Sequence, residues 1–241
     1  MSRHRLTLIG LLGAGLLAAG ALTGCASGAA SSSPTSSSSS DAVSPEPAGG
    51  VEAAWVDAGR AIAVVTSGSS SCVPSVNGEP QVVDGALVVD LVEPAQEPCT
   101  RDMAPRATLV TLPAGTGATA DLAVRVSGAV EGETTLAALG DVSSASEDLA
   151  PSAGWVTSSL VAIVTYGSSS CVPVVESVTA DGDRVAVQFA APPADQVCTM
   201  DYAPRVTLAD VGAEAGQGEV SLVLSGGNVQ APDPIPVLGT R

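Results

Sequence analysis

The chain contains no lysine, and its only histidine is His4, near the start. All 25 acidic residues lie beyond Cys25, where the only basic residues are arginines, and the formal net charge is −16. A serine nucleophile needs a neighbouring base such as histidine or lysine, so we do not expect a serine hydrolase. A strongly acidic surface repels phosphate backbones, so nucleic acid is not an expected partner.

Aromatic side chains are also rare: beside Trp55 and Trp155 the chain has two tyrosines and one phenylalanine. Both tryptophans are expected to pack in the core. Glycoside hydrolysis needs two acids across a cleft, and no suitable pair stands out. The cysteines lack the CxxC spacing of zinc sites, and the Asp-Gly-Asp segment at 181–183 lacks the remaining ligands of a calcium loop. We therefore expect no enzyme, no cofactor and no metal.

The first 24 residues have the pattern of a secretion signal. Arg3 and Arg5 precede an apolar stretch over residues 6–22, which ends in the sequence LTGC. This ending resembles the lipobox of bacterial lipoproteins, and the resemblance implies cleavage after Gly24 and lipidation of Cys25. We expect the protein at the cell membrane, anchored by lipid and facing the extracytoplasmic side. The alternative is a secreted protein in which Cys25 is incidental.

Residues 25–50 consist mainly of serine, alanine, proline and glycine. They lack the apolar residues that would offset the entropy of ordering, so they are predicted to form a disordered tether.

The remainder of the chain contains an internal repeat. The sequence GSSSCVP occurs at residues 68–74 and again at 167–173, and CTRDMAPRATL at 99–109 matches CTMDYAPRVTL at 198–208. Trp55 likewise matches Trp155. These matches predict two β repeats, residues 51–140 (the first repeat) and 154–241 (the second repeat), joined by a polar linker at 141–153.

Each repeat has the pattern of short β-strands. One apolar face alternates with polar or small residues along a strand of each repeat, at Val185, Val187 and Phe189 and at Leu87, Val89 and Leu91. Further strands are predicted at residues 60–67, 106–112, 121–127 and 134–139, with counterparts in the second repeat. Asp-Gly pairs at 84–85 and 181–182 predict hairpins. We therefore expect an all-β protein with two tandem small β-sandwich-like (or barrel-like) domains.

Four cysteines remain once Cys25 is set aside, and an even set in an exported protein predicts disulfides. Four cysteines allow three pairings. The equal spacing within the repeats favours Cys72–Cys99 and Cys171–Cys198. Loops of this length should each contribute about 3–4 kcal/mol to stability in the chain-entropy description.

Two polar motifs surround these cysteines. The serines at 69–71 and 168–170 are predicted to form turns in which hydroxyls satisfy local backbone groups. The motif CTxDxAPR places Asp102 near Arg106, and Asp201 near Arg205. A carboxylate and a guanidinium at this spacing suggest a bidentate ion pair within the repeat; a ligand clamp for an anionic group is the alternative.

Taken together, the lipobox, the serine-rich tether and the two cysteine motifs resemble lipoproteins of high-GC Gram-positive bacteria, an uncharacterised family. The resemblance implies a location and no particular reaction. We expect a non-catalytic binding or scaffolding module at the cell envelope, with an envelope protein or a small ligand as partner. The alternative is an inhibitor of a secreted or wall-associated enzyme.

Overall fold

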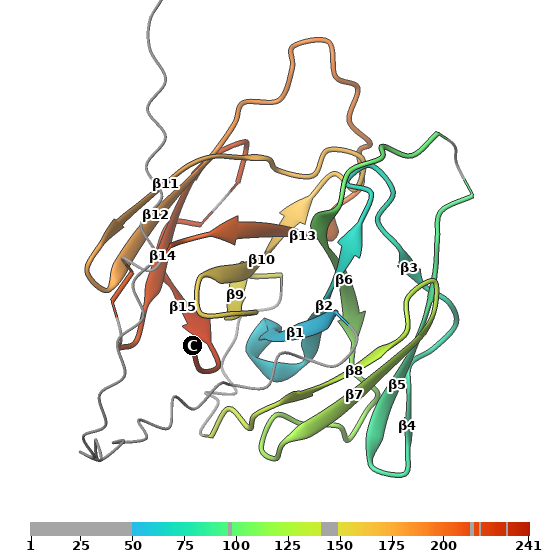
Figure 1. Ribbon diagram of the computed structural model, residues 1–241. Helices are drawn as coiled ribbons and strands as arrows, with labels where there is room; N and C mark the ends of the chain where they lie inside the picture. The colour runs from blue at the N-terminus through green and yellow to red at the C-terminus, as the bar shows by residue number, and fades with distance from the viewer. Residues whose placement is uncertain (1–49, 96–97, 141–148, 213–214, 217, 230) are drawn as a thin grey trace, which may run out of the picture. The chain divides into compact units, whose positions relative to one another are not determined.

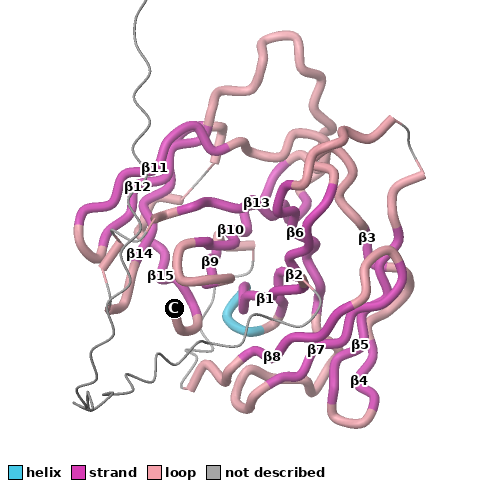
Figure 2. Tube along the Cα trace, in the orientation of Figure 1, coloured by secondary structure: helices cyan, strands magenta, loops and turns pink. Residues whose placement is uncertain are grey.

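The computed structural model describes residues 50–95, 98–140, 149–212, 215–216, 218–229 and 231–241. Their regular secondary structure is almost entirely β-strand, joined by loops (Figures 1 and 2). Helical geometry in these ranges is limited to one short 3-10 turn, η1 (Asp57–Gly59), so they hold no helix of membrane-spanning length. The predicted signal peptide, Cys25, the tether up to residue 49 and residues 141–148 of the linker lie outside the described residues.

The first repeat contains two sheets. Its strands are β1 (Val51–Val56), β2 (Ala61–Gly68), β3 (Ser75–Val76), β4 (Gln81–Val83), β5 (Ala86–Val92), β6 (Ala104–Thr111), β7 (Leu122–Gly128) and β8 (Gly132–Leu136). Strands β1, β2 and β6 form one antiparallel sheet, and the remaining strands form the other around the parallel pair β5–β7. The strands predicted at 60–67, 106–112, 121–127 and 134–139 correspond to β2, β6, β7 and β8.

The second repeat has a related arrangement. Its first strand, β9 (Ser152–Trp155), begins within the predicted linker. The others are β10 (Leu160–Gly167), β11 (Val175–Asp181), β12 (Arg184–Phe189), β13 (Ala203–Asp210), β14 (Ser221–Gly226) and β15 (Ile235–Leu238). Strand β10 pairs with β9 and β13, and β12 pairs with β11 and β14. Strand β15 runs parallel to β9 and antiparallel to β14, so it joins both groups into one seven-stranded sheet.

An apolar core lies between the two groups of strands in each repeat. The alternation predicted for the middle strands is confirmed, because its apolar residues are all buried: Leu87, Val89, Leu91, Val185, Val187 and Phe189. Trp55 and Trp155 are buried in these two cores as well, as predicted. The hairpin prediction is also confirmed, since Asp84 and Gly85 form the turn between β4 and β5.

A third apolar cluster lies between the repeats. Its buried members come from both of them: Ala54, Val56, Ala61, Ala63, Ala162 and Val164. The β1–β2–β6 sheet therefore buries one face against β5, β7 and β8 and the opposite face against the second repeat. Strands with two buried faces carry continuous apolar runs, which accounts for the sequence AIAVV in β2.

The prediction of two tandem sandwich-like or barrel-like domains is therefore wrong, although the all-β class is confirmed. The chain passes from β5 to β6 in the other sheet and then back to β7, which lies parallel to β5. The same course leads from β12 through β13 to β14. With a further core between the repeats, this coiling stack of sheets reads as a β-solenoid. The two repeats pack against each other because β1, β2 and β10 carry small apolar residues on the faces that point away from their own cores. Packing the repeats together removes these residues from water.

Candidate functional site

Each repeat has a polar cluster next to its disulfide, and both predicted disulfides are confirmed. Cys72 bonds to Cys99 and Cys171 bonds to Cys198, each across 27 residues with the Cα atoms 5.6 Å apart. Each bond joins the segment that follows one strand to the segment that precedes its neighbour in the sheet. These strand pairs are β2 with β6 and β10 with β13. The GSSSC and CTxDxAPR motifs are thereby brought together.

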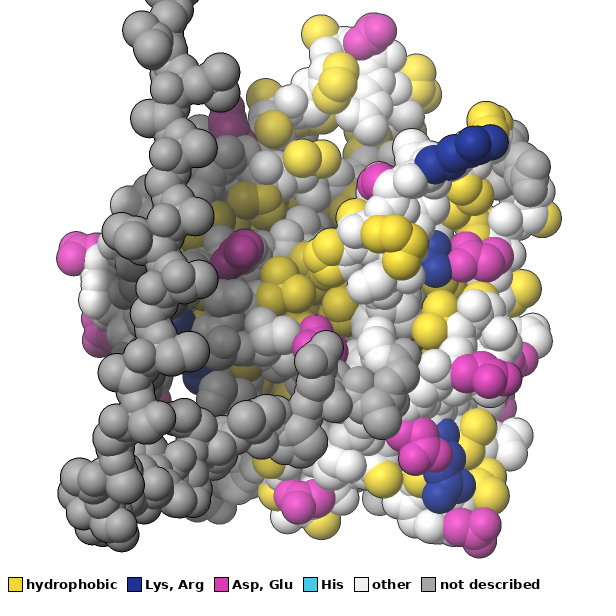
Figure 3. Space-filling model, viewed as in Figure 1, with side chains coloured by type: hydrophobic (Ala, Val, Ile, Leu, Met, Phe, Trp, Pro, Cys, Tyr) yellow, Lys and Arg dark blue, Asp and Glu magenta, His cyan; other side chains and the backbone are white. Residues whose placement is uncertain are grey.

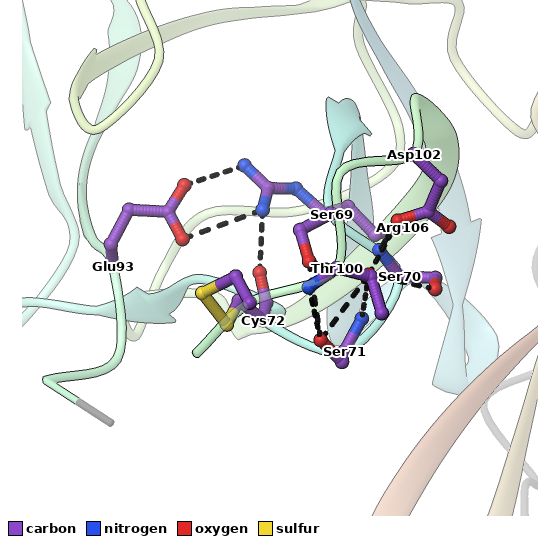
Figure 4. The surroundings of a disulfide bond; sticks show 9 residues. Ser69, Ser70, Ser71, Cys72, Glu93, Thr100, Asp102 and Arg106 are labelled. Carbon is purple, nitrogen blue, oxygen red and sulfur yellow. Dashed lines mark hydrogen bonds and ion pairs between the residues drawn. A yellow bond between two sulfur atoms is a disulfide. The ribbon is translucent and has the colours of Figure 1, made fainter. Parts of the chain in front are cut away.

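The serines form compact turns tied to the second motif (Figure 4). The backbone N–H of Ser70 donates to Oδ1 of Asp102 at 3.1 Å, and the N–H of Thr100 donates to Oγ of Ser71 at 2.9 Å. The second repeat reproduces both distances with Ser169, Asp201, Thr199 and Ser170. The predicted turns are therefore present, since the N–H of Cys72 and of Cys171 donate to the carbonyl oxygens of Ser69 and Ser168. Of the serine hydroxyls, only that of Ser71 and its counterpart in the second repeat accept from a backbone group of the described residues, and that group lies across the disulfide.

The two aspartates of these turns are held as carboxylates. Hydrogen bonds from the Ser169 side chain, then from Thr199, and from the Ser169 backbone lower the pKa of Asp201 to about 2. Equivalent hydrogen bonds from Ser70 and Thr100 hold the pKa of Asp102 well below its usual range. A carboxylate held in its charged form is a poor general acid near neutral pH.

The arginine of each motif binds the backbone at the cysteine, whereas the aspartate of the same motif binds the serine turn. Arg106 donates through Nη1 to the carbonyl oxygen of Cys72, and two residues later Thr108 donates to the carbonyl oxygen of Pro74 at 2.8 Å. A Cβ on Gly68 would lie 2.5 Å from Cζ of Arg106, so the guanidinium needs the flat backbone of a glycine. These contacts explain why the glycine, cysteine, proline and arginine of the two motifs occur together.

The predicted ion pair between Asp102 and Arg106 is wrong. Arg106 pairs instead with Glu93, whose Oε1 lies 2.6 Å from Nη2 and whose Oε2 lies 3.4 Å from Nη1. Figure 4 shows Glu93 facing the guanidinium while Asp102 turns toward the serine turn. The reason is that the backbone N–H of Ser70 and the hydroxyl of Thr100 already donate to the aspartate.

Arg205 in the second repeat also has no bond to its aspartate. Its Nη1 donates to the carbonyl oxygen of Cys171 at 2.8 Å, and its Nη2 donates to the carbonyl oxygen of Tyr166 at 3.1 Å. None of the described acidic residues forms an ion pair with it, and its buried Nε has no acceptor. Burial without a counter-charge lowers the pKa of Arg205.

A cavity of about 670 Å³ opens beside Arg205. Its walls are the serine turn, the disulfide, the loop after β12 and both tyrosines of the chain, Tyr166 and Tyr202. The tyrosine rings are stacked with their centroids 6.0 Å apart. Among the described residues that line it, Arg205 is the single charged one, in a chain whose formal net charge is −16. The volume lies within the range of about 300–1,000 Å³ that is usual for small-molecule sites.

The chemistry that this arrangement supports is binding. Among the described residues no group of three or more histidine, cysteine or acidic side chains could hold a metal ion. On the face shown in Figure 3, hydrophobic and acidic side chains are interspersed and basic ones are few. A lone buried cation beside apolar and tyrosine surface provides charge recognition and contact area.

Sequence reasoning did not identify Glu93, Ala191 or the two tyrosines as members of the site. A signal was present, because both tyrosines fall at repeat positions that Ser67 and Met103 occupy in the first repeat. Two of the differences between the repeats thus lie beside Arg205.

Compared with protein-family models, with curated proteins and with solved structures, the chain gives no significant match.

Proposed function

We propose that this protein is a non-catalytic binding module, anchored by lipid at Cys25 on the extracytoplasmic side of the cell membrane. The observation that carries the binding role is the cavity beside Arg205, which combines one buried cation with both tyrosines of the chain. The two disulfides fit an oxidising compartment. The LTGC sequence and the serine-rich segment after it support the anchor and the tether.

The binding role is tested by a crosslinking pull-down. The bait is the mature chain with Cys25→Ser, kept oxidised and incubated with the envelope fraction of the source organism; mass spectrometry identifies what it captures. A reduced and alkylated bait controls for dependence on the fold. A component captured by the oxidised bait alone supports the proposal. Turnover of an envelope substrate by the purified chain would contradict it.

The anchor is tested separately by metabolic labelling with an alkyne analogue of palmitate. The wild-type chain is expected to take up the label and to sediment with membranes, whereas Cys25→Ser is expected to lose both properties. Retention of the label by the variant would show that Cys25 is not the lipidated residue.

A further inference from the structure

The two repeats differ at one acidic position beside their arginines. Strand register makes Phe189 the counterpart of Leu91, because these residues pair with Gly226 and Gly128 at matching positions of β14 and β7. Two residues further on, Ala191 therefore takes the position of Glu93. The first repeat supplies a carboxylate to its own arginine, and the second repeat supplies a methyl group that lines the cavity.

The hydrogen bonds of the two guanidinium groups reflect this difference. In the first repeat Nε of Arg106 donates to Oγ1 of Thr66, and Nη1 and Nη2 both reach Glu93. In the second repeat Nη2 of Arg205 takes the equivalent hydroxyl, Oγ1 of Thr165, and Nε is left without an acceptor. Buried donors in native proteins are nearly always paired, so the Nε of Arg205 lacks a hydrogen-bond acceptor that such a group normally has.

A carboxylate of a bound ligand would allow every N–H of this guanidinium that lacks an acceptor to be paired. If it drew the guanidinium into the orientation of the first repeat, Nε would face Thr165 while Nη1 and Nη2 would bind the two carboxylate oxygens. The described residues of the cavity lining include no acid that would repel such a ligand. Its body would lie against Tyr202 and the prolines at 192 and 193, which also line the cavity.

We propose that the cavity beside Arg205 binds a monocarboxylate with an apolar or aromatic body, whose carboxylate takes the place that Glu93 holds in the first repeat. A single guanidinium matches one planar carboxylate. A doubly charged phosphate would leave one charge uncompensated within a strongly acidic chain. This inference rests on the proposed binding function and narrows it to one site and one ligand class.

The test is an NMR titration of the mature Cys25→Ser chain with two matched probes, 3-phenylpropionate and 3-phenylpropionamide. The acid is expected to shift the resonances of Tyr166, Tyr202 and the Arg205 side chain, and to bind at least ten-fold more tightly than the amide. No binding of the acid, or equal binding of both probes, would overturn the proposal without depending on any variant.

A variant then locates the site. Ala191→Glu installs the acid of the first repeat and is expected to weaken binding of the acid probe at least ten-fold, with the thermal midpoint unchanged or raised. Ala123→Glu is the matched control, since it adds the same charge at an exposed position of β7 that does not line the cavity. Unchanged binding by Ala191→Glu would also overturn the proposal.

The pull-down separates this inference from the proposed function. An envelope component captured equally by the wild-type and Ala191→Glu baits would support the binding module and overturn the cavity as its site. A small acid bound by the chain in the absence of any captured protein identifies the source of the carboxylate as a free metabolite. Capture lost in Ala191→Glu identifies the source as a carboxylate on the captured component.

Discussion

The backbone carbonyl oxygen of Trp55 lies 1.8 Å from the position that a Cβ on Gly154 would occupy. The two residues belong to different repeats, and close by the N–H of Asp57 donates to Oγ of Ser152 at 2.8 Å. The position that matches Gly154 in the first repeat is Ala54, which is fully buried. The approach of the repeats thus leaves room for a side chain at one of these matching positions and excludes it at the other.

Gly154→Ala is expected to lower the free energy of unfolding by about 1–3 kcal/mol, because the added methyl group forces β1 and β9 apart. Chemical denaturation measures the change. Gly117→Ala is the control, since the nearest atom to its new Cβ is Oγ1 of Thr119 at 3.9 Å, and we expect a change within about 0.5 kcal/mol. Equal losses in both variants would show that the contact with Trp55 is not responsible.

Glu93→Gln is expected to destabilise the first repeat by about 1–3 kcal/mol, because the nearly buried Arg106 loses its charged partner. The comparison is Glu133→Gln, which removes an ion pair with Arg125 whose two side chains are 73% and 48% exposed. That exposed pair should contribute less than about 1 kcal/mol. Thermal and denaturant unfolding of both variants would contradict the assignment if Glu133→Gln proved the more damaging.

Asp201 is expected to make stability fall at acid pH. Its folded pKa of about 2 lies below the ordinary value of 3.8, so its contribution is complete above pH 3.8 and is lost as the pH falls through about 2. Asp201→Asn should therefore be less stable than the wild-type chain at neutral pH, and the two should converge toward pH 2. Denaturation curves over pH 2–7 test this, and a difference independent of pH would contradict it.

The two disulfides are expected to contribute equally to stability and unequally to binding. Both close loops of 27 residues, so replacing either cysteine pair with alanines should cost about 3–4 kcal/mol. Only the Cys171–Cys198 pair orders the carbonyl that binds Arg205, so its loss alone should weaken the binding of 3-phenylpropionate. Denaturation and NMR titration measure the two effects, and equal weakening by both pairs would contradict the assignment.

The strand positions could be predicted because their signals are local. Alternation along Leu87, Val89 and Leu91 marks one buried face, and the Asp84-Gly85 pair supplies the positive φ angles that its hairpin turn requires. The disulfide pairing followed from equal spacing. The stacking of the repeats was harder to predict, because short runs such as AIAVV indicate burial on both faces without naming the surface that covers the second face.

The partner of Arg106 could not be predicted from the motif. Proximity in sequence favoured Asp102, yet the N–H of Ser70 and the hydroxyl of Thr100 donate to that carboxylate. Glu93 comes from the loop after β5 and reaches the arginine through the tertiary fold. Its replacement by Ala191 in the second repeat becomes apparent only once strand register aligns the two loops, because their lengths differ.

The apolar cluster shared by the repeats determines how the protein unfolds. If one repeat unfolded alone, the apolar residues that the other repeat contributes to this cluster would be exposed to water. These are Ala54 and Val56 in the first repeat, or Ala162 and Val164 in the second. Unfolding of either repeat alone therefore costs additional free energy, and thermal unfolding should proceed as a single cooperative transition. The shared cluster thus makes the stability of each repeat depend on the other, although each repeat has its own disulfide.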